Sequence, residues 1–398
     1  MEKLNYSYSS KPAQSGEFGK SSGVVNSGNL EILVLANQQT DTVSFTIGTT
    51  VNGFATIWDA VCGDFAEKFA VGGLNFILHD NGATPGVVAL RLRQAYENYC
   101  HGVGALTANA SYVELTPRQR IAAIVDAGSF SEILPPQELV MSPHLGDLGL
   151  LTAFDDGVVI GDAQIDGQAV AIIAQQANFM GGAVGEVNGA KISGMCLRAQ
   201  AKNYAAVVLL LDSGGVRLQE ANAGEIAISE VIRSIFAVRA DGVPVVAVVA
   251  GKNGAFGGIG ITAACCDHLL ITELGRSGVS GPEVIETVMG VEEYDSKDRA
   301  LVWRTCGGRQ RALLGQASYC ANSLDAINHG LRLALASGAN FTRENINQRQ
   351  QLLQQQVSEF AELHDACEIW DKLGIANPPQ IPEINDTEFL TILEGVNK

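Results

Sequence analysis

The sequence predicts two successive parts: a small α+β module over residues 1–100 and, from about residue 154, an α/β domain. Three observations support this division. The first hundred residues hold short segments rich in β-forming residues. In the later part, continuous apolar runs alternate with helical patterns. Three glycine-rich turns each follow an apolar run in this later part. Alternating strands and helices indicate crossover connections around a parallel sheet.

The first module contains three expected strands, one expected helix and two turn signals. The strands are 30–35, 43–47 and 74–78, and the turns are 26–29 and 81–86. Apolar residues recur at helical spacing from Phe54 to Phe69 and predict a helix there. Residues 101–112 are small and weakly polar, which predicts a linker. A new helix should begin after it, with Thr116 as its cap and Pro117 at its first position.

The larger part begins with an expected hairpin of residues 158–162 and 170–175 around the turn Asp166-Gly167. Continuous β-branched and leucine runs then predict strands that are buried on both faces. These strands are expected at 207–211, 245–250 and 269–272, and helices at 186–203 and 225–240.

The C-terminal region contains a Gln-rich amphipathic stretch at 341–372, whose apolar residues fall near one stripe. This pattern fits a helix packed on its own domain or a helix that contacts another subunit. The tail after Pro378-Pro379 gives no structural prediction.

The composition excludes several classes of partner. The net charge is −17, whereas binding to nucleic acid or an anionic membrane needs clustered Lys and Arg. The start lacks the apolar region of a signal peptide, and the longest apolar runs are too short to span a bilayer. The eight cysteines form no CxxC motif, so we expect a cytoplasmic protein with reduced thiols and no metal site.

The three glycine-rich turns are the candidate functional elements: residues 179–189, 211–220 and 251–260. Glycine lets backbone N–H groups approach a ligand closely, and the start of a helix adds a partial positive charge. The turns carry no Ser–His pair and no close pair of carboxylates. The implied chemistry is therefore stabilisation of negative charge on a carbonyl oxygen without a side-chain nucleophile.

Specific motifs carry a family resemblance over most of the chain. Residues 111–335 resemble the β subunit of biotin-independent malonate decarboxylase, in the carboxyltransferase branch of the crotonase superfamily. The segments that carry this resemblance are ELTPRQRIAAIVDAGSFSEIL, GGAVGEVNGAKI, LLLDSGGVRLQEANAG, AFGGIGITAACCDHLLIT, GPEVIE and EEYDSKDRALVWRTCGG. Residues 1–98 resemble the δ subunit, the acyl carrier of the same enzyme, through SGNLEILV, TTVNGFATIW and LHDNGATPGVVALRLRQAYE. The resemblance implies a fusion of the two subunits.

The implied architecture is a carrier domain (1–100), a linker (101–112), a crotonase-like spiral ββα domain (113–335) and a C-terminal helical extension (336–398). On the carrier, the resemblance places a covalent 2'-(5''-phosphoribosyl)-3'-dephospho-CoA group at Ser27. Two residues after Ser27, this chain has Asn29 where an acidic residue is expected in carriers of this type. Ser323, in a sequence that resembles the attachment site of ordinary carriers, is interpreted as a helix cap.

In the larger domain, the resemblance assigns two sources of N–H donors for a thioester oxygen. The first is Gly214 and Gly215, with Val216 as a further candidate, and the second is Gly257 and Gly258. The position of a catalytic glutamate in related hydratases is occupied by Ile261, which fits decarboxylation rather than hydration.

Three further residues are candidate substrate-binding positions. Gly181 and Gly182 are expected to line the thioester channel. Arg217 is assigned either to a substrate carboxylate or to a charge pair with Glu220 at the helix end.

The implied activity is decarboxylation of a malonyl thioester on the carrier to the acetyl thioester through a stabilised enolate. Implied partners are a γ subunit, an acyl-carrier transferase (α) subunit and the enzyme that attaches the prosthetic group. Two alternatives remain: a subunit of a biotin-dependent carboxyltransferase, and a scaffold that only presents the carrier. The chain has no biotinyl-lysine motif, because Lys191, Lys202 and Lys252 lie in other contexts.

Overall fold

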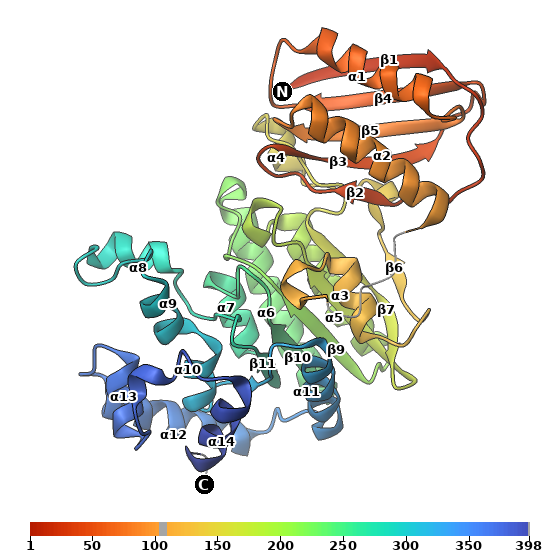
Figure 1. Cartoon of the computed structure of the whole chain (residues 1–398). Coiled ribbons are helices and arrows are strands. Elements are labelled where there is room, and N and C mark those ends of the chain that lie inside the picture. Colours follow the sequence, from red (N-terminus) through yellow and green to blue (C-terminus); the bar gives the residue numbers. More distant parts are fainter. Residues whose placement is uncertain (103–109, 397–398) are drawn as a thin grey trace.

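The computed structural model describes residues 1–102 and 110–396. Two parts are evident in Figure 1: a smaller N-terminal part, and a larger part that carries the C-terminal helices on its far side. The expected linker falls largely on residues 103–109, which lie outside the described residues. Among the helices of the described residues, none combines the length and apolarity needed to cross a membrane.

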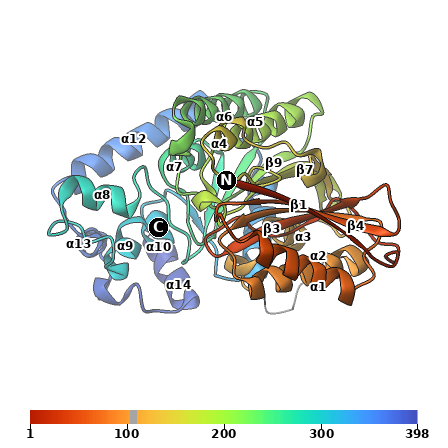
Figure 2. The same cartoon turned by 90° about the horizontal axis from the view of Figure 1, so that it is seen from above.

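The smaller part is a five-stranded sheet in the order β1-β4-β5-β3-β2, with two helices on one face (Figure 2). The strands are β1 Glu2–Ser9, β2 Ser21–Gly23, β3 Asn29–Ala36, β4 Thr42–Thr49 and β5 Leu74–Asn81, and the helices are α1 Ala55–Lys68 and α2 Pro85–His101. The three expected strands and the expected helix are confirmed. Their apolar side chains form one buried cluster between sheet and helices.

Three elements of this part differ from the sequence prediction. β1 pairs antiparallel with β4 at the sheet edge, although its sequence has no apolar run. The short strand β2 pairs antiparallel with β3. The interpretation of 81–86 as a turn was wrong at its end, because Pro85 and Gly86 begin α2. Thr84 caps that helix by accepting a hydrogen bond from the Val87 N–H, and Pro85 occupies a position that needs no N–H donor.

The larger part contains a seven-stranded sheet in the order β12-β11-β10-β9-β8-β7-β6. The strands are β6 Ser131–Ile133, β7 Val158–Ile165, β8 Gln168–Gln175, β9 Ala206–Leu211, β10 Val245–Val249, β11 His268–Ile271 and β12 Ser318–Tyr319. Strands β7 and β8 form the expected antiparallel hairpin. The neighbours β8 to β12 all run parallel, as the crossover pattern predicted.

Helices cover both faces of this sheet, which explains the continuous apolar strands. Val207 and Leu209 of β9 contribute to one core with α5 (Glu186–Ala201) and α6 (Asn222–Ala240). Val208 and Leu210 contribute to the opposite core, with α3 (Pro117–Ile124) and α11 (Leu324–Ser337). Successive side chains of a strand point to opposite faces, so every residue of β9 must be apolar.

Local capping signals set the start of several helices. Thr116 caps α3, with Pro117 at the first position, and the Gln119 side chain accepts from the Thr116 N–H at 3.0 Å. Ser323 caps α11 by accepting from the Ala326 N–H at 3.2 Å, as interpreted from the sequence. The remaining helices around the turns are α4 Pro143–Asp147, α7 Gly257–Ala264, α8 Pro282–Met289, α9 Arg299–Cys306 and α10 Gly308–Leu313.

Single 3₁₀ turns complete the connections between these elements. They are η1 Tyr112–Glu114, η2 Pro136–Glu138, η3 Met180–Gly182, η4 Leu218–Glu220 and η5 Pro378–Gln380. Tyr112 is buried against the larger part, so the expected linker ends in a packed residue.

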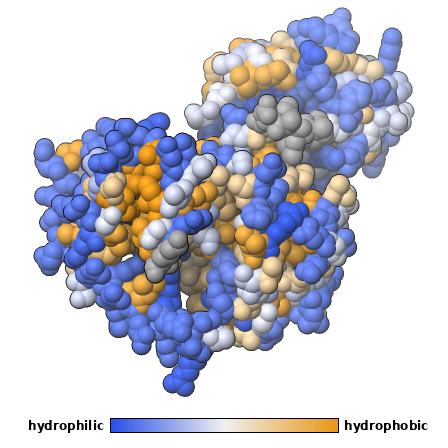
Figure 3. All heavy atoms as spheres, turned by 60° about the horizontal axis from the view of Figure 1, so that its bottom comes forward, coloured by the Kyte–Doolittle hydropathy of each residue, from blue (hydrophilic) through white to orange (hydrophobic). Residues whose placement is uncertain are grey.

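The C-terminal region divides into α12 (Arg343–Phe360), α13 (Ala366–Lys372) and α14 (Asp386–Val396). Helix α12 buries none of its residues, and Val357 on its apolar stripe is 69% exposed. The C-terminal tail, for which no structure was predicted, packs Phe389 into an apolar cluster with Trp370 of α13. Figure 3, viewed from this side, shows apolar surface gathered in a hollow on the left among hydrophilic side chains.

The smaller part contacts the larger part through buried polar groups. The carboxyl group of Glu31, on β3, accepts from the Phe154 N–H at 3.1 Å through Oε2. His79 of β5 lies 2.6 Å through Nδ1 from the Thr152 carbonyl oxygen and stacks on the Phe154 ring. Because a carbonyl only accepts, Nδ1 carries the proton. Burial lowers the pKa of His79, which favours this neutral ring.

The buried Glu31 carboxyl makes this contact sensitive to pH. Burial, together with the negative charge of Asp155, raises the pKa of Glu31 from 4.5 to about 8. Asp155 itself stays ionised because Arg118 and Lys191 lower its pKa against the effect of burial. Between pH 4.5 and about 8 the contacting state therefore holds a proton that a solvent-exposed Glu31 would release. The contact should weaken as pH rises through this window.

We predict that Glu31→Gln flattens this pH dependence. The thermal unfolding midpoint of the wild-type chain should fall relative to that of the variant as pH rises from about 4.5 to about 8. In this range only the wild type releases a proton from residue 31 when it unfolds. Differential scanning fluorimetry across that range measures the difference. Glu17→Gln, at an exposed glutamate of the same part, is the matched control and should follow the wild type. Parallel curves for wild type and Glu31→Gln would contradict the assignment.

Candidate functional site

The three glycine-rich turns lie at one edge of the larger sheet. Strands β8, β9 and β10 are adjacent and parallel, so their carboxyl ends meet there. The first turn follows β8, the second follows β9, and the third follows β10 and enters α7. In open α/β sheets, ligands bind in the crevice at this end of the strands.

Backbone hydrogen bonds join the three turns into one unit. The Gly214 N–H donates to the Gly181 carbonyl at 2.9 Å, which links the second turn to the first. The Phe256 N–H donates to the Ser213 carbonyl at 3.0 Å and links the third turn to the second. The Val184 N–H donates to Gly215 at 2.9 Å and reinforces the first link. The three turns are therefore fixed relative to one another, and a ligand bound by one of them is held by the whole hydrogen-bonded unit.

The hydrogen bonds show which N–H groups remain available to a ligand. The roles expected for Gly214 and Gly215 need correction, because Gly214 donates to Gly181 and Gly215 donates to the Ser213 hydroxyl at 3.1 Å. Within the hydrogen bonds of the described residues, the N–H groups of Val216, Gly257 and Gly258 have no partner. Gly257 and Gly258 are the first two residues of α7, where N–H groups point out of the helix.

The second and third turns touch where these N–H groups are found. Gly215 has φ +128° and Gly257 has φ +56°, both in the region that favours glycine. A Cβ on Gly215 would lie 3.6 Å from the Gly257 Cα, and one on Gly257 would lie 3.4 Å from the Gly215 Cα. Val216 and Gly258 each follow one of these two touching glycines in the chain.

The two glycines of the first turn have different surroundings. Gly182 has φ +71°, and a Cβ there would lie 2.0 Å from the Asp212 carbonyl oxygen. Gly181 has a similar φ of +68°, but a Cβ there would meet nothing within 4 Å. Gly182 is thus required by packing against the second turn, whereas Gly181 faces open space, as a residue lining a channel would.

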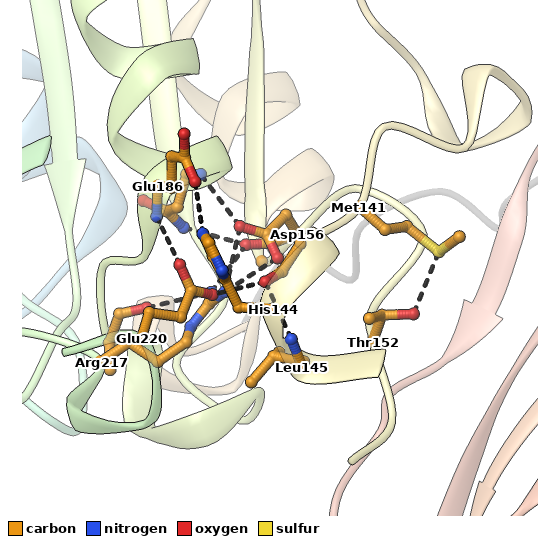
Figure 4. Close-up of polar contacts among 12 residues, drawn as sticks. Met141, His144, Leu145, Thr152, Asp156, Glu186, Arg217 and Glu220 are labelled. Atoms are coloured by element: carbon orange, nitrogen blue, oxygen red, sulfur yellow. Dashed lines mark hydrogen bonds and ion pairs between the residues drawn. The ribbon is translucent and has the colours of Figure 1, made fainter. Parts of the chain in front are cut away.

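Arg217 is fully buried at the centre of a polar network (Figure 4). Its Nη1 donates to Asp156 at 2.9 Å and to Glu220 at 2.7 Å. Nη2 donates to the carbonyls of Asp156 and Ala183, each at 3.2 Å. The guanidinium also lies over the Phe179 ring, 5.2 Å from its centroid. This arrangement matches the charge-pair alternative for Arg217, because both amino groups are occupied by the protein's own oxygens.

Glu220 extends this network to two more elements. Its Oε1 accepts from the Ser142 hydroxyl at 2.7 Å, which fixes the start of α4. Its Oε2 accepts from the Glu186 N–H at 2.6 Å, which satisfies the start of α5. Although burial opposes it, these hydrogen bonds and Arg217 lower the pKa of Glu220. Arg217 also opposes the effect of burial on Asp156, but the pKa of Asp156 remains raised.

The sequence interpretation missed one pair of side chains beside the first turn. His144 of α4 contacts Glu186 at 2.5 Å, Nε2 to Oε2, and both side chains are partly exposed (Figure 4). The signal for α4 was Ser142-Pro143, a cap followed by proline at the first helical position. The contact with Glu186 joins residues 42 apart and has no local signal.

Two other predicted positions are exposed. Ser27 is exposed on the turn before β3, where its N–H donates to the Asn26 side chain at 2.8 Å. Asn29 accepts from Arg91 Nε at 3.0 Å. Ile261 lies on α7 and is 42% exposed, so this position presents a hydrocarbon surface.

The fold and the joined turns define a carboxyl transferase-type enzyme component preceded by an acyl-carrier domain. Residues 20–99 match the family model described as the malonate decarboxylase delta subunit, and residues 109–304 match the carboxyl transferase domain. The chain belongs to the malonate decarboxylase family and combines its carrier and carboxyltransferase-like components.

Relatives and a solved structure support both components. The chain is 35% identical over 303 residues to the malonyl-S-ACP:biotin-protein carboxyltransferase MADC of Malonomonas rubra, covering 70% of this chain and 94% of that protein. It is 44% identical over 95 residues to the malonate decarboxylase acyl carrier protein of Acinetobacter calcoaceticus, covering 24% and 93% respectively. A chain of the Pseudomonas malonate decarboxylase hetero-tetramer in complex with malonate is similar, with TM-score 0.61 and 41% identity. That match covers 65% of this chain and 95% of the other.

We predict that Arg217→Met strongly destabilises the fold. Removing one partner of a buried ion pair typically costs about 3–5 kcal/mol, because the remaining charges stay buried without compensation. Urea unfolding measures the loss. Arg233→Met is the matched control, since Arg233 pairs with Glu230 at the same i,i+3 spacing on the exposed face of α6. Equal losses of unfolding free energy in the two variants would contradict the prediction, because the buried network would then stabilise the fold no more than an exposed ion pair does.

A second prediction compares Gly182→Ala with Gly181→Ala. Both residues have nearly the same φ, so the conformational cost of alanine should be similar. Only the Gly182 variant forces a methyl group against the Asp212 carbonyl, and such overpacking typically adds about 1–3 kcal/mol. The difference between the two unfolding free energies isolates this contact. A variant pair of equal stability would contradict the close approach of the first and second turns.

Proposed function

We propose that the chain carries malonyl and acetyl thioesters on a CoA-like group at Ser27 and, with a γ subunit, releases CO₂ from the malonyl form. The observation that carries this proposal is the group of unpartnered N–H donors at Val216, Gly257 and Gly258. They occur where two glycine turns touch at the carboxyl edge of a parallel sheet. A thioester carbonyl placed between them would accept from both turns.

The chemistry needs these donors and no side-chain nucleophile. When the bond between Cα and the carboxylate of a malonyl thioester breaks, CO₂ leaves and its bonding electron pair delocalises onto the thioester oxygen. The N–H groups stabilise this enolate oxygen as its charge develops, and each such donor typically contributes about 2.7–4 kcal/mol. A proton from water or from a partner residue then adds to Cα. Gly258 is the assigned donor of the third turn, and Val216 replaces Gly214 and Gly215 in the second.

Apolar and small residues around the donors are consistent with decarboxylation. Ile261 presents no carboxylate that could activate water for hydration. Gly181, beside open space, is assigned to the channel through which the thioester enters. We retain Gly182 as the support of that channel, and we assign Arg217 to holding the turns rather than to the substrate carboxylate.

Ser27 fits a covalent attachment site for 2'-(5''-phosphoribosyl)-3'-dephospho-CoA. Its side chain is exposed, and a Cβ on the neighbouring Gly28 would meet nothing within 4 Å, so a modifying enzyme has access. When attached, such a group supplies the thiol that carries the acyl unit.

The proposed partners follow from this chemistry. The chain needs the attaching enzyme, an acyl-carrier transferase (α) subunit that exchanges acetyl for malonyl, and the γ subunit. The similarity to a chain of a hetero-tetramer supports partner subunits. Exposed apolar side chains on α8, such as Val288 at 79% and Met289 at 57%, are typical of subunit contacts. We place the assembly in the cytoplasm.

A second candidate function has a specific observation in its favour. The relative from Malonomonas rubra is named as a carboxyltransferase to a biotin protein. In that reaction the carboxyl group would pass to biotin on another chain instead of leaving as CO₂. The same enolate would form, so the glycine turns serve both reactions. Inhibition of the purified activity by avidin would favour this second function.

The proposed function predicts that Ser27→Ala abolishes both modification and activity. The intact mass of wild-type chain from the native host should exceed the sequence mass by one prosthetic group, and the variant should match the sequence mass. CO₂ release from malonate by the assembled enzyme should fall to background. Ser323→Ala is the matched control and should keep the added mass, losing only about 1 kcal/mol from its helix cap. An active enzyme with unmodified Ser27 would overturn the carrier assignment.

A further inference from the structure

The segment immediately before Ser27 packs on the larger part of the same chain. Val25 is 6% exposed and shares a buried apolar cluster with Leu145 of α4 and with Phe179. Val24 and Met180 pack against the same cluster. Phe179 and Met180 are the first residues of the first glycine-rich turn, so the attachment loop of the carrier and that turn share one apolar core.

The chain separations at this core are short on both sides. Ser27 is two residues from Val25, and Gly181 is two residues from Phe179. Each of these steps spans at most about 7 Å even when fully extended. The distance from Ser27 to Gly181 of the first turn is therefore shorter than a CoA-like arm.

Polar contacts hold the carrier in the same position. Phe154 donates its N–H to Glu31, and its ring stacks on His79, with centroids 4.3 Å apart. Two residues further along the chain, Asp156 binds Arg217 of the second turn. One short segment thus contacts the carrier at one end and the network that supports the glycine turns at the other.

We propose that the fused carrier delivers its thioester in cis, to the glycine turns of its own chain. The apolar core around Val25 positions Ser27 at the entrance formed by the first turn. This proposal rests on the proposed function, since it concerns how the same site receives its substrate. A fused carrier could deliver its thioester either to the turns of its own chain or to the equivalent turns of a second copy, whereas a separate carrier has no chain of its own to serve.

Complementation between two defective chains tests this proposal. One chain carries Ser27→Ala, which leaves the turns intact but removes the attachment site. The other carries Gly258→Leu, whose side chain would clash with the buried Ile228 and so displace the start of α7 that bears the donor. The two are co-expressed with different tags and with the partner subunits, and assemblies are purified on both tags. Val216→Pro, which removes the other N–H donor, replaces Gly258→Leu in a parallel experiment in case leucine prevents folding.

Cis delivery predicts that the mixed assemblies release CO₂ at background rate in both experiments. Delivery in trans would restore roughly half of the wild-type rate, since half of the sites would have an arm within reach at high effective concentration. Restored activity with either variant overturns the proposal. Failure of the proposed function has a different signature: wild-type assemblies would then release no CO₂ from malonate.

Disrupting the contact gives an independent measurement. Val25→Asp buries a charge in the apolar core and should lower CO₂ release by roughly tenfold or more. Ile57→Asp, the same kind of change at a 42% exposed position on α1, is the control and should leave the rate unchanged. Intact mass must show that both variants still carry the prosthetic group. A Val25→Asp rate equal to that of the control would contradict delivery through this contact.

Discussion

The arrangement of the turns depends on one buried cation. Arg217 binds Asp156 and Glu220 with no exposure to solvent, and its two carboxylate partners lie on different segments. Through Glu220 the same charge fixes the start of α4 and of α5. Placing an arginine and two carboxylates in the interior is costly unless their hydrogen bonds are satisfied. The network offsets this cost by fixing the positions of the glycine-rich turns. Glycine residues have no side chains, so the turns could not be held together by side-chain packing alone.

The candidate site consists of backbone, and this explains its composition. Gly215 and Gly257 adopt positive-φ conformations that disfavour other residues, and their backbones lie in van der Waals contact between the second and third turns. Donors built in this way stay fixed when negative charge develops, so no reorganisation accompanies the reaction.

Much of the fold could be predicted because its signals are local. The β9 run is apolar at every position, which only a strand covered on both faces requires, and Thr116-Pro117 marks a helix start in two residues. β1 escaped prediction because an edge strand alternates exposed and half-buried residues and needs no apolar run. At the candidate site, the sequence predicted donors at Gly214 and Gly215, whereas in the second turn only the N–H of Val216, named as a further candidate, has no partner among the hydrogen bonds of the described residues. Which N–H group is free depends on the Gly181 carbonyl and the Ser213 hydroxyl, and neither contact is visible in the order of residues. The contact between Val25 and Phe179 joins positions 154 apart, far beyond any local pattern.

The presence of both components in one chain has a consequence for the cell. Translation makes one carrier domain for every set of glycine turns, so the ratio of the two never depends on the relative expression of two genes. A separate carrier must find its enzyme by diffusion and must be supplied at a matching level. Here dilution of the enzyme leaves the local concentration of the carrier unchanged, because a covalent tether fixes it.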